Sequence, residues 1–405
     1  MIEALKERVL VDYRATPKGA YLSTLKVRGR KLTNPLSLEE LAHAVTAVEK
    51  HEDHEDIERE LKLVQVKFIG RKAMGVIHDR HGRTTEMPFT ESALRQYVGF
   101  VDNIRYGNMN KWCEQKSGRD ITSALLTEQT LKQVNRPVLV RTSLRAGAGR
   151  CIRSVHGSGS ASSYTPYGNA RLLKDLLSSI GELKNCIVAS MKITDNYFRC
   201  RLFAPQKVAH TGEYIYHKPI DMELRIPVPV IDINNSATGH SALEIMLAFL
   251  TLICTNGLAI PDIQTKWTRQ HRGNTSRLRH GMLGAFESAL AQTYGVANDI
   301  RAAHDIQVAN LPQVTTRLLN EAAKRYDVVN DNFIGKVIGT GLNDPTTPQD
   351  NSVAQIVQAT SLIAQTMKDV KRERMVEEMS HWILKRGLEL GDEHGGRIPV
   401  VVGEA

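Results

Sequence analysis

The sequence predicts an α+β fold, in which a core of β-hairpins and helices with an antiparallel sheet precedes a mostly helical C-terminal region. Up to about residue 275, short apolar runs that end in turn residues alternate with helical patterns. After that point the apolar residues follow the helical period. A chain of 405 residues is also too long for one ordinary domain. We therefore expect an N-terminal arm over 1–35, an α+β core over 36–275 and a helical region over 276–405.

The first half of the core is expected to hold a helix, two strands and a second helix. Residues 36–48 follow a helical period, and 63–69 and 73–78 are short apolar runs typical of strands. Phe89 and Leu94 flank Thr90 as a hydrophobic staple flanks an N-cap. A helix is therefore predicted to begin after Thr90.

A similar order of elements recurs in the next part of the core. Asn169 is a predicted N-cap, and Gly181 is placed to end the helix that follows it. The clearest hairpin in the chain comes after this helix. The predicted elements are strands over 137–140 and 150–155, a helix over 169–180, and hairpin strands over 187–193 and 197–203.

The end of the core is expected to contain a strand and a buried helix. Pro227 and Pro229 interrupt the predicted strand 222–233, which favours an edge position or a bulge. Ser241 and Glu244 have the spacing of a capping box before an almost wholly apolar run, which predicts a helix ending near Gly257. Further helices are predicted over 278–296, 311–326, 353–370 and 375–390.

The composition argues against several classes of protein. Hydrophobic residues make up 41% of the chain and charged residues 24%, as in folded globular proteins. The longest apolar stretch, 242–254, falls short of the roughly 20 residues that a membrane span needs. The five cysteines include no CxxC pair, which argues against a disulfide framework or a zinc ribbon. Since no secretory leader is visible either, we expect a cytoplasmic protein without a membrane partner.

The net charge of +9 is concentrated in two stretches. Residues 129–174 contain eight basic residues and no acid, and residues 263–286 contain five basic residues and no acid. Between Ser37 and Glu60, by contrast, nine acids accompany only Lys50 and Arg59. A basic surface favours a polyanionic partner. The sequence leaves open whether the acidic segment 37–60 covers the basic stretches.

The first basic stretch is the main candidate for a nucleic-acid interface. Its arginines can neutralise phosphates, its small residues let a sugar–phosphate backbone approach closely, and its tyrosines can stack on unpaired bases. The alternative is a solvated basic face beside a flexible Gly/Ser loop. The candidate residues here are Arg141, Arg145, Arg150, Arg153, Tyr164 and Tyr167.

The second basic stretch combines one large aromatic residue with basic groups, as grooves that follow a nucleic-acid backbone do. Arg277 and Arg279 fall in the first turn of a predicted helix, where cations are unfavourable unless an anion is close. The alternative is again a solvated surface. The candidate residues are Lys266, Trp267, Arg269 and Arg272.

Catalytic and metal-binding motifs are not evident. The chain lacks a Walker A sequence, a GxSxG elbow and an HExxH motif. His51 and His54 have a spacing that can hold a metal, but such an acidic run is more often solvated surface. We therefore predict no cofactor, no metal and no catalytic residue.

Five stretches resemble a protein family from phages and plasmids, domain-of-unknown-function family 932. The family's "NS-x-x-G" turn is similar to residues 235–243, and its "C-x-N-G-L" sequence is similar to residues 254–258. Similar stretches also occur at Phe89–Gly99, Arg150–Leu177 and Arg269–Asn274. The resemblance covers roughly residues 60–280. It implies a role in nucleic-acid metabolism, and the order of hairpins and helices resembles that of phage single-strand annealing proteins.

Three hypotheses follow. The first is a homo-oligomeric protein that binds single-stranded DNA and promotes strand annealing or recombination for a phage or plasmid in a bacterial host. The second is a nucleic-acid-processing enzyme with His156, His271 or His280 as general acid–base groups. The third is a phage structural or interaction protein that assembles through its helical C-terminal half. The preference between DNA and RNA and the size of the oligomer stay open.

Overall fold

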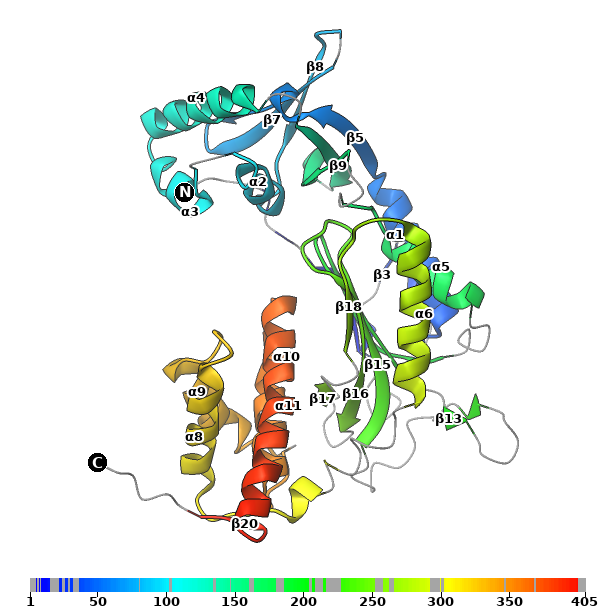
Figure 1. The fold of residues 1–405 in the computed structure, drawn as a ribbon, viewed down its shortest axis with the longest axis vertical. Coiled ribbons are helices and arrows are strands. Elements are labelled where there is room, and N and C mark those ends of the chain that lie inside the picture. Colours follow the sequence, from blue (N-terminus) through cyan, green and yellow to red (C-terminus); the bar gives the residue numbers. More distant parts are fainter. Residues whose placement is uncertain are drawn as a thin grey trace.

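The computed structural model shows an α+β fold with antiparallel sheets that becomes helical toward the C-terminus, which confirms the predicted fold class (Figure 1). The structure describes residues 36–399 and, before them, 5, 7, 9–14, 22–23, 26–27 and 30–31. The gaps within 36–399 are 80, 102–103, 134–135, 146, 160–163, 180–185, 204–205, 208–213, 216–226, 252–257, 262–265, 292–298, 300–301, 346 and 368.

The first unit contains two three-stranded sheets and three helices around one apolar core. Phe89 and Tyr97 are its largest fully buried side chains. One sheet has the order β6-β7-β8, with strands Val64–Ile69, Lys72–His78 and Thr84–Pro88. The other has the order β10-β9-β5, with strands Gly149–Gly157, Pro137–Arg145 and Glu55–Glu60. The helices are α2 (Glu91–Val98), α3 (Tyr106–Trp112) and α4 (Lys116–Lys132), and a 3₁₀ turn spans Leu61–Leu63.

The second unit is built on an eight-stranded sheet with the order β17-β16-β15-β12-β11-β1-β2, in which β18 also pairs with β16. Helices α1 (Leu38–Glu52), α5 (Asn169–Ser179) and α6 (Thr275–Ala291) pack into the apolar core on one face of this sheet. The strands are Val9–Arg14 (β1), Leu22–Ser23 (β2), Val188–Thr194 (β11), Phe198–Phe203 (β12), Pro227–Asn235 (β15), Leu243–Thr251 (β16), Leu258–Pro261 (β17) and Trp267–Arg269 (β18). Two short hairpins join β3 (Lys26–Val27) to β4 (Arg30–Lys31) and β13 (Gln206–Lys207) to β14 (Tyr214–Ile215).

The third unit is helical and lies against the opposite face of the large sheet, where α10 and α11 contact β17 (Figure 1). The helices are α8 (Leu311–Ala323), α9 (Asp331–Lys336), a π-helical turn (Val337–Gly341), α10 (Val353–Gln365) and α11 (Val370–Glu393). Strands β19 (Gln307–Val308) and β20 (Arg397–Ile398) form a parallel pair.

Several local predictions are confirmed. The Thr90 hydroxyl accepts a hydrogen bond from the Ala93 amide at 3.2 Å, as an N-cap does. The predicted hairpin is β11 with β12. Asn169, by contrast, is the first residue of α5 and not its N-cap, because its side-chain oxygen accepts a hydrogen bond from Nδ2 of Asn235 at 2.8 Å. Gly181, the predicted end of this helix, lies outside the described residues. Side-chain caps and two-residue alternation act within a few residues of the chain, so they can be recognised without the tertiary structure.

The apolar run after Ser241 is a strand, β16, and the prediction of a helix there is wrong. Its side chains are buried on both faces of the sheet. Leu243, Ile245 and Leu247 face the side covered by α6, whereas Met246 and Ala248, which pair with Asp232 and Val230, are fully buried on the other face. A strand covered on both faces is apolar at consecutive positions, and this pattern cannot be told from that of a buried helix.

Strand β15 lies between β12 and β16, although its prolines favoured an edge position. The pairing with β12 ends at Phe203↔Val230, so Pro227 and Pro229 lie beyond the last β12 pair. Because this part of the strand needs no amide to reach β12, the prolines are tolerated. Helix α6 begins at the predicted start of the helical region, yet its Met282 and Phe286 pack into the core of the sheet.

Candidate functional site

Two of the candidate arginines on the β9–β10 hairpin form buried ion pairs with the acidic segment. Nε and Nη2 of Arg141 donate to the two carboxylate oxygens of Asp56 at 2.6 and 2.7 Å. Nη1 of Arg153 donates to Glu52 at 2.6 Å. Both guanidinium groups are almost fully buried. Strands β5 and β9 pair with Asp56 opposite Arg141, so sheet formation brings these charges together.

The other two candidate arginines of the hairpin also have carboxylate partners. Arg145 lies 2.9 Å from Asp195, and Arg150 pairs with Asp53 and, at 3.5 Å, with Glu55. The acidic segment 37–60 therefore covers Arg141, Arg150 and Arg153, whereas the partner of Arg145 lies outside that segment. Phosphate binding at these four arginines would first require the ion pairs to open.

The remaining candidates are spread over different environments. The Tyr167 ring is fully buried with its hydroxyl 2.8 Å from Asp175, so it has no face free for a base. Lys266 pairs with Glu378 at 2.8 Å. Trp267 packs against α6, where a Cβ at Gly281 would lie 2.7 Å from its ring. The last three candidates are Arg269 and Arg272, both exposed, and Tyr164, which is half-buried.

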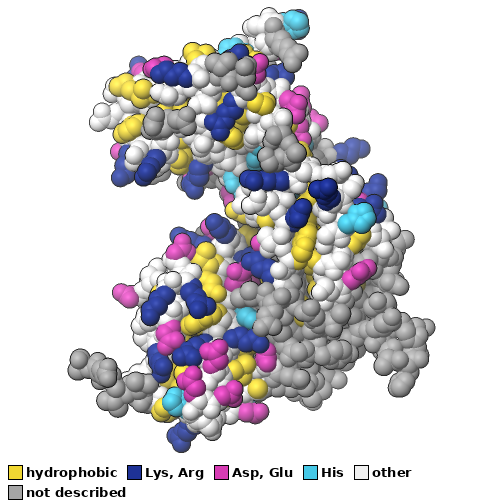
Figure 2. Space-filling model, in the orientation of Figure 1, with side chains coloured by type: hydrophobic (Ala, Val, Ile, Leu, Met, Phe, Trp, Pro, Cys, Tyr) yellow, Lys and Arg dark blue, Asp and Glu magenta, His cyan; other side chains and the backbone are white. Residues whose placement is uncertain are grey.

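The two basic stretches meet at one cavity of about 680 Å³ between the first unit and the large sheet. Tyr164 forms an isolated bridge with Arg272, and the Thr165 amide donates to the His271 carbonyl at 2.8 Å. The space-filling view shows a hollow between the first unit and the helical region that Lys, Arg and His side chains border (Figure 2). The cavity is lined by Phe100, Arg136, Pro137, His156, Gly157, Ser158, Tyr164, Gly239, His240, Ser241, Ala242, Gln270, His271 and Arg272.

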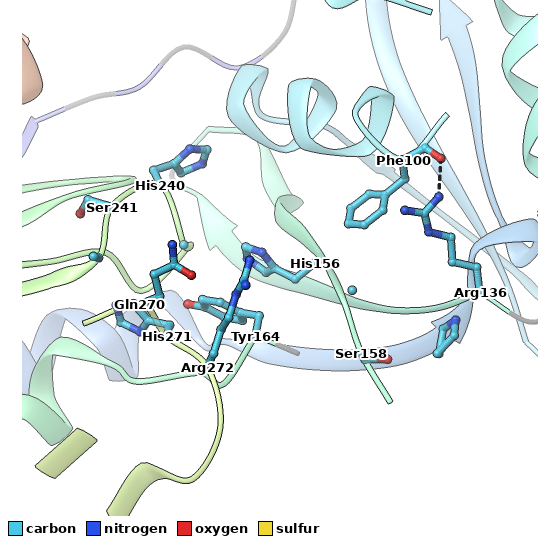
Figure 3. Close-up of a pocket in the computed structure, with 14 residues that line it drawn as sticks. Phe100, Arg136, His156, Ser158, Tyr164, His240, Ser241, Gln270, His271 and Arg272 are labelled. Carbon is cyan, nitrogen blue, oxygen red and sulfur yellow. Dashed lines mark hydrogen bonds between the residues drawn. The ribbon is translucent and has the colours of Figure 1, made fainter. Parts of the chain in front are cut away.

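Stacked rings form one wall of this cavity. The His156 and Tyr164 rings are 3.8 Å apart and nearly parallel, and His271 lies 5.6 Å from Tyr164 on a similar plane. The Tyr164 hydroxyl donates to the Ala237 carbonyl at 2.7 Å, which fixes the ring. Arg272 lies alongside these rings, whereas Phe100 and Arg136 lie across the cavity (Figure 3).

Glycine is required at position 239 beside the stack. Its φ is +72°, a backbone conformation that other residues rarely adopt. A Cβ there would lie 2.5 Å from Cε1 of His156 and 3.0 Å from the Tyr164 ring. The turn between β15 and β16 can therefore approach the rings only because it has no side chain at this point.

The three histidines of the cavity are neutral at pH 7. Burial, aided by the nearby Arg141, lowers the pKa of His156 to about 3 and that of His271 to about 4. Burial, aided by Arg95, lowers the pKa of His240 to about 4. Within the described part of the chain, Nε2 of His156, both ring nitrogens of His271 and the Ser241 hydroxyl are buried without a hydrogen-bond partner. These atoms can donate to or accept from a ligand.

The charged groups that line the cavity are cationic. Arg136 donates to the Phe100 carbonyl at 3.0 Å, and its guanidinium lies 4.9 Å from the centre of the Phe100 ring. Arg272 is exposed and has no carboxylate partner among the residues that the structure describes. No Asp or Glu is among the lining residues. The cavity therefore suits a ligand that combines an aromatic ring with an anionic group.

Sequence reasoning found some of this site and missed the rest. Of the candidates for binding, Tyr164 and Arg272 line the cavity, and so do His156 and His271 from the enzyme hypothesis. His280 is exposed on α6 and is not among the lining residues. The residues missed were Phe100, Arg136, His240, Ser241 and Gln270. The signal for Ser241 was its place in the predicted capping box, which is a structural interpretation, and His240 gave no signal of its own.

Comparison of the chain with known proteins does not identify a family for it. Models of known protein families, curated proteins and solved structures were searched, and none matches the chain. The resemblance to the phage and plasmid family thus stays a prediction. Within the described ranges, no group of three or more His, Cys, Asp or Glu residues is arranged to hold a metal, and no helix has the length and apolar character to cross a membrane.

Proposed function

We propose that the protein binds single-stranded nucleic acid, DNA in the first place, and holds an unpaired base in the 680 Å³ cavity. The observation that carries this proposal is the combination of stacked rings and arginines in a cavity without carboxylates. Aromatic faces stack on any unpaired base, and arginines neutralise the phosphates beside it.

The properties of the cavity fit a nucleotide better than a simple anion. Its volume lies within the range of about 300–1,000 Å³ that is usual for ligand sites. The neutral imidazoles of His156 and His271 can pair with the donors and acceptors on the edge of a base. In a duplex those edges are occupied by the partner strand, so a preference for single strands follows.

Strand annealing in a homo-oligomer extends this proposal. In the first unit, Ile69, Trp112, Ile121 and Leu131 each expose about half of their side-chain surface. A second copy of the chain would be able to cover such side chains. The family resemblance implies that the protein acts for a phage or plasmid in the cytoplasm of a bacterial host.

The test is fluorescence anisotropy with a labelled single strand of about 20 nucleotides, titrated against salt. We expect the double variant Arg136→Ala Arg272→Ala to bind about tenfold more weakly. The slope of log affinity against log salt should become shallower by about 0.7 for each lost phosphate contact.

The matched control is Arg71→Ala, because Arg71 is exposed in the β6–β7 turn and does not line the cavity. It removes one positive charge, against two in the cavity variant, and should leave both affinity and slope close to those of the unaltered protein. If the control weakens binding as much as the cavity variant does, the proposed site is not the one that binds.

The second candidate function is a nucleic-acid-processing enzyme. The observation in its favour is that His156 and His271 line the cavity and have buried ring nitrogens without partners, where a neutral imidazole can accept a proton. End-labelled single strands incubated with magnesium or manganese would yield products, and His271→Gln would abolish them. If the strands stay intact under conditions that saturate binding, the enzyme hypothesis is excluded for those substrates.

A further inference from the structure

A second, smaller cavity of about 200 Å³ adjoins the first. His240 and Ser241 line both cavities, so the turn before β16 forms a wall that they share. The far side of the smaller cavity is formed by the beginning of α11, including Lys371, Arg374 and Met375. It therefore exists only where the helical unit rests on the tip of the large sheet.

The smaller cavity has an aromatic and apolar lining. The Tyr197 ring lies 6.3 Å from the His240 ring, at an angle of 54°. Val370 and Met375 supply apolar surface, whereas the Phe198 side chain packs in the core on the other face of the sheet. A planar ring inserted here would contact an aromatic face and a thioether, both of which pack well against bases.

Polar groups without partners point to a ligand. Within the described residues, the Ser241 hydroxyl and Nη2 of Arg374 are buried and make no hydrogen bond. Lys371 is exposed at the cavity and can reach an anion. Three basic residues line the cavity together with two acids: Lys266, Lys371 and Arg374 with Glu244 and Glu378. Lys266 and Arg374 are paired with Glu244 and Glu378, so among the described lining residues Lys371 is the cation left for an anionic ligand.

We propose that this cavity is a second base subsite, which takes the nucleotide next to the one held in the larger cavity. The strand crosses the wall at His240 and Ser241, one base enters each cavity, and Lys371 contacts the phosphate of the second nucleotide. This inference rests on the proposed function and adds to it that the unit of recognition is two consecutive unpaired nucleotides.

The position of α11 that forms this subsite is fixed by buried charges. Lys192 lies 3.3 Å from Glu373. Arg199 and Arg201 of β12 both pair with Glu377 of α11. Glu373 lies between Lys371 and Arg374 in the sequence, and Glu377 lies about one turn after Arg374. These contacts hold this part of the helix against the sheet, so the second cavity is preformed.

The experiment is a competition assay with the full-length protein. Unlabelled 5′-phosphorylated oligothymidylates of one to four nucleotides displace a fluorescein-labelled single strand of about 20 nucleotides. We expect the dinucleotide to bind at least about fivefold more tightly than the mononucleotide, which is the lower end of the contribution of one stacked base. The third and fourth nucleotides should each increase the affinity by much less than the second.

Variants of the second cavity should remove the affinity gained from the second nucleotide and leave the affinity for the mononucleotide unchanged. Tyr197→Ala is expected to reduce the ratio of dinucleotide to mononucleotide affinity to below about twofold, and Tyr197→Phe to retain it. Lys371→Gln should weaken the dinucleotide about threefold. Its matched control is Arg372→Gln, since Arg372 is the adjacent exposed residue of α11 and lines a different cavity.

The outcomes separate the two proposals. If the labelled strand binds and the mononucleotide competes, but the second nucleotide adds nothing or its gain survives Tyr197→Ala, the second subsite is refuted and the proposed function stands. If no strand of any length binds, the proposed function fails and the subsite fails with it.

Discussion

Three imidazoles in one cavity are kept uncharged at pH 7, and their protonation is linked to the stability of the fold. Burial is the main cause of the lowered pKa of His156, His240 and His271, and cations nearby act in the same direction. In the unfolded chain a histidine has a pKa of about 6.5. Below that pH the unfolded state binds protons that the folded state does not, so stability is present above it and is lost as the pH falls.

We predict that the free energy of unfolding at pH 5.5 is lower than at pH 7.5. Each such histidine can contribute up to about 1.4 kcal/mol of this loss, and somewhat less where water reaches the ring. In the variant His156→Gln His271→Gln the loss between the two pH values should shrink by about 2 kcal/mol. Urea unfolding at both pH values measures it.

The control for this prediction is His280→Gln, because His280 is exposed on α6. Its pH dependence should match that of the unaltered protein. An unchanged pH dependence in the double variant would show that the cavity histidines are protonated in the folded state too.

At the scale of elements, the two most unusual charge segments of the sequence are partners in one sheet. β5 is acidic, β9 and β10 are rich in arginine, and β5 pairs with β9 in an antiparallel register. Composition revealed each segment, but it contains no information on which strands become neighbours. That is why Arg141 and Arg153 were expected to face a polyanion, whereas they face Asp56 and Glu52.

The same limit explains which elements were predicted correctly. The cap of α2 at Thr90 and the β11–β12 hairpin depend on neighbours in sequence. The strand β16 depends on layers that reach it from α6 and from the helical unit, far away in the chain. In the site, the Tyr164–Arg272 contact joins segments more than a hundred residues apart. Both segments lack acids, and this was the one sequence feature that suggested they meet. Gly239 and His240 belong to no motif that predicts a binding site.

We predict that Asp56→Asn destabilises the protein by about 2 kcal/mol. The change leaves the buried Arg141 guanidinium with a neutral partner, and the cost of a broken buried pair is reduced because Asp56 is one-third exposed. In a double-mutant cycle with Arg141→Met, the coupling energy should exceed about 1 kcal/mol. Denaturant unfolding of the four proteins measures it.

The comparison for this pair is Glu128→Gln, which breaks the exposed i,i+4 pair of Glu128 with Lys132 on α4. Solvent screens such exposed pairs, so they contribute little to stability. A coupling between Asp56 and Arg141 no larger than that of the exposed pair would mean that the acidic segment does not hold the hairpin.

At the scale of the whole molecule, a buried charge network joins the large sheet to the helical unit. Arg199, Arg201 and Asp232 of the sheet are almost fully buried together with Glu377 of α11. Burial alone would raise the pKa of Asp232, yet Arg199 and Arg201 hold it well below the usual range. Buried ion pairs add little net stability against an apolar contact, but they require one alignment of the two surfaces. The network therefore specifies where α11 lies.

We predict that Glu377→Gln destabilises the protein by about 3–5 kcal/mol, because it leaves two buried guanidinium groups short of one negative charge. Glu389→Gln, at an exposed position of the same helix, should cost less than about 0.5 kcal/mol.

The Glu377→Gln variant should also affect the second cavity. Without denaturant, where Glu377→Gln remains folded, α11 should be held less firmly against the sheet. Because α11 forms one side of the second cavity, this variant should lose the affinity gained from a second nucleotide while mononucleotide binding persists. Thermal unfolding and the oligothymidylate competition measure the two effects. A variant that is as stable as Glu389→Gln would show that the charge network is not needed to dock the helical unit.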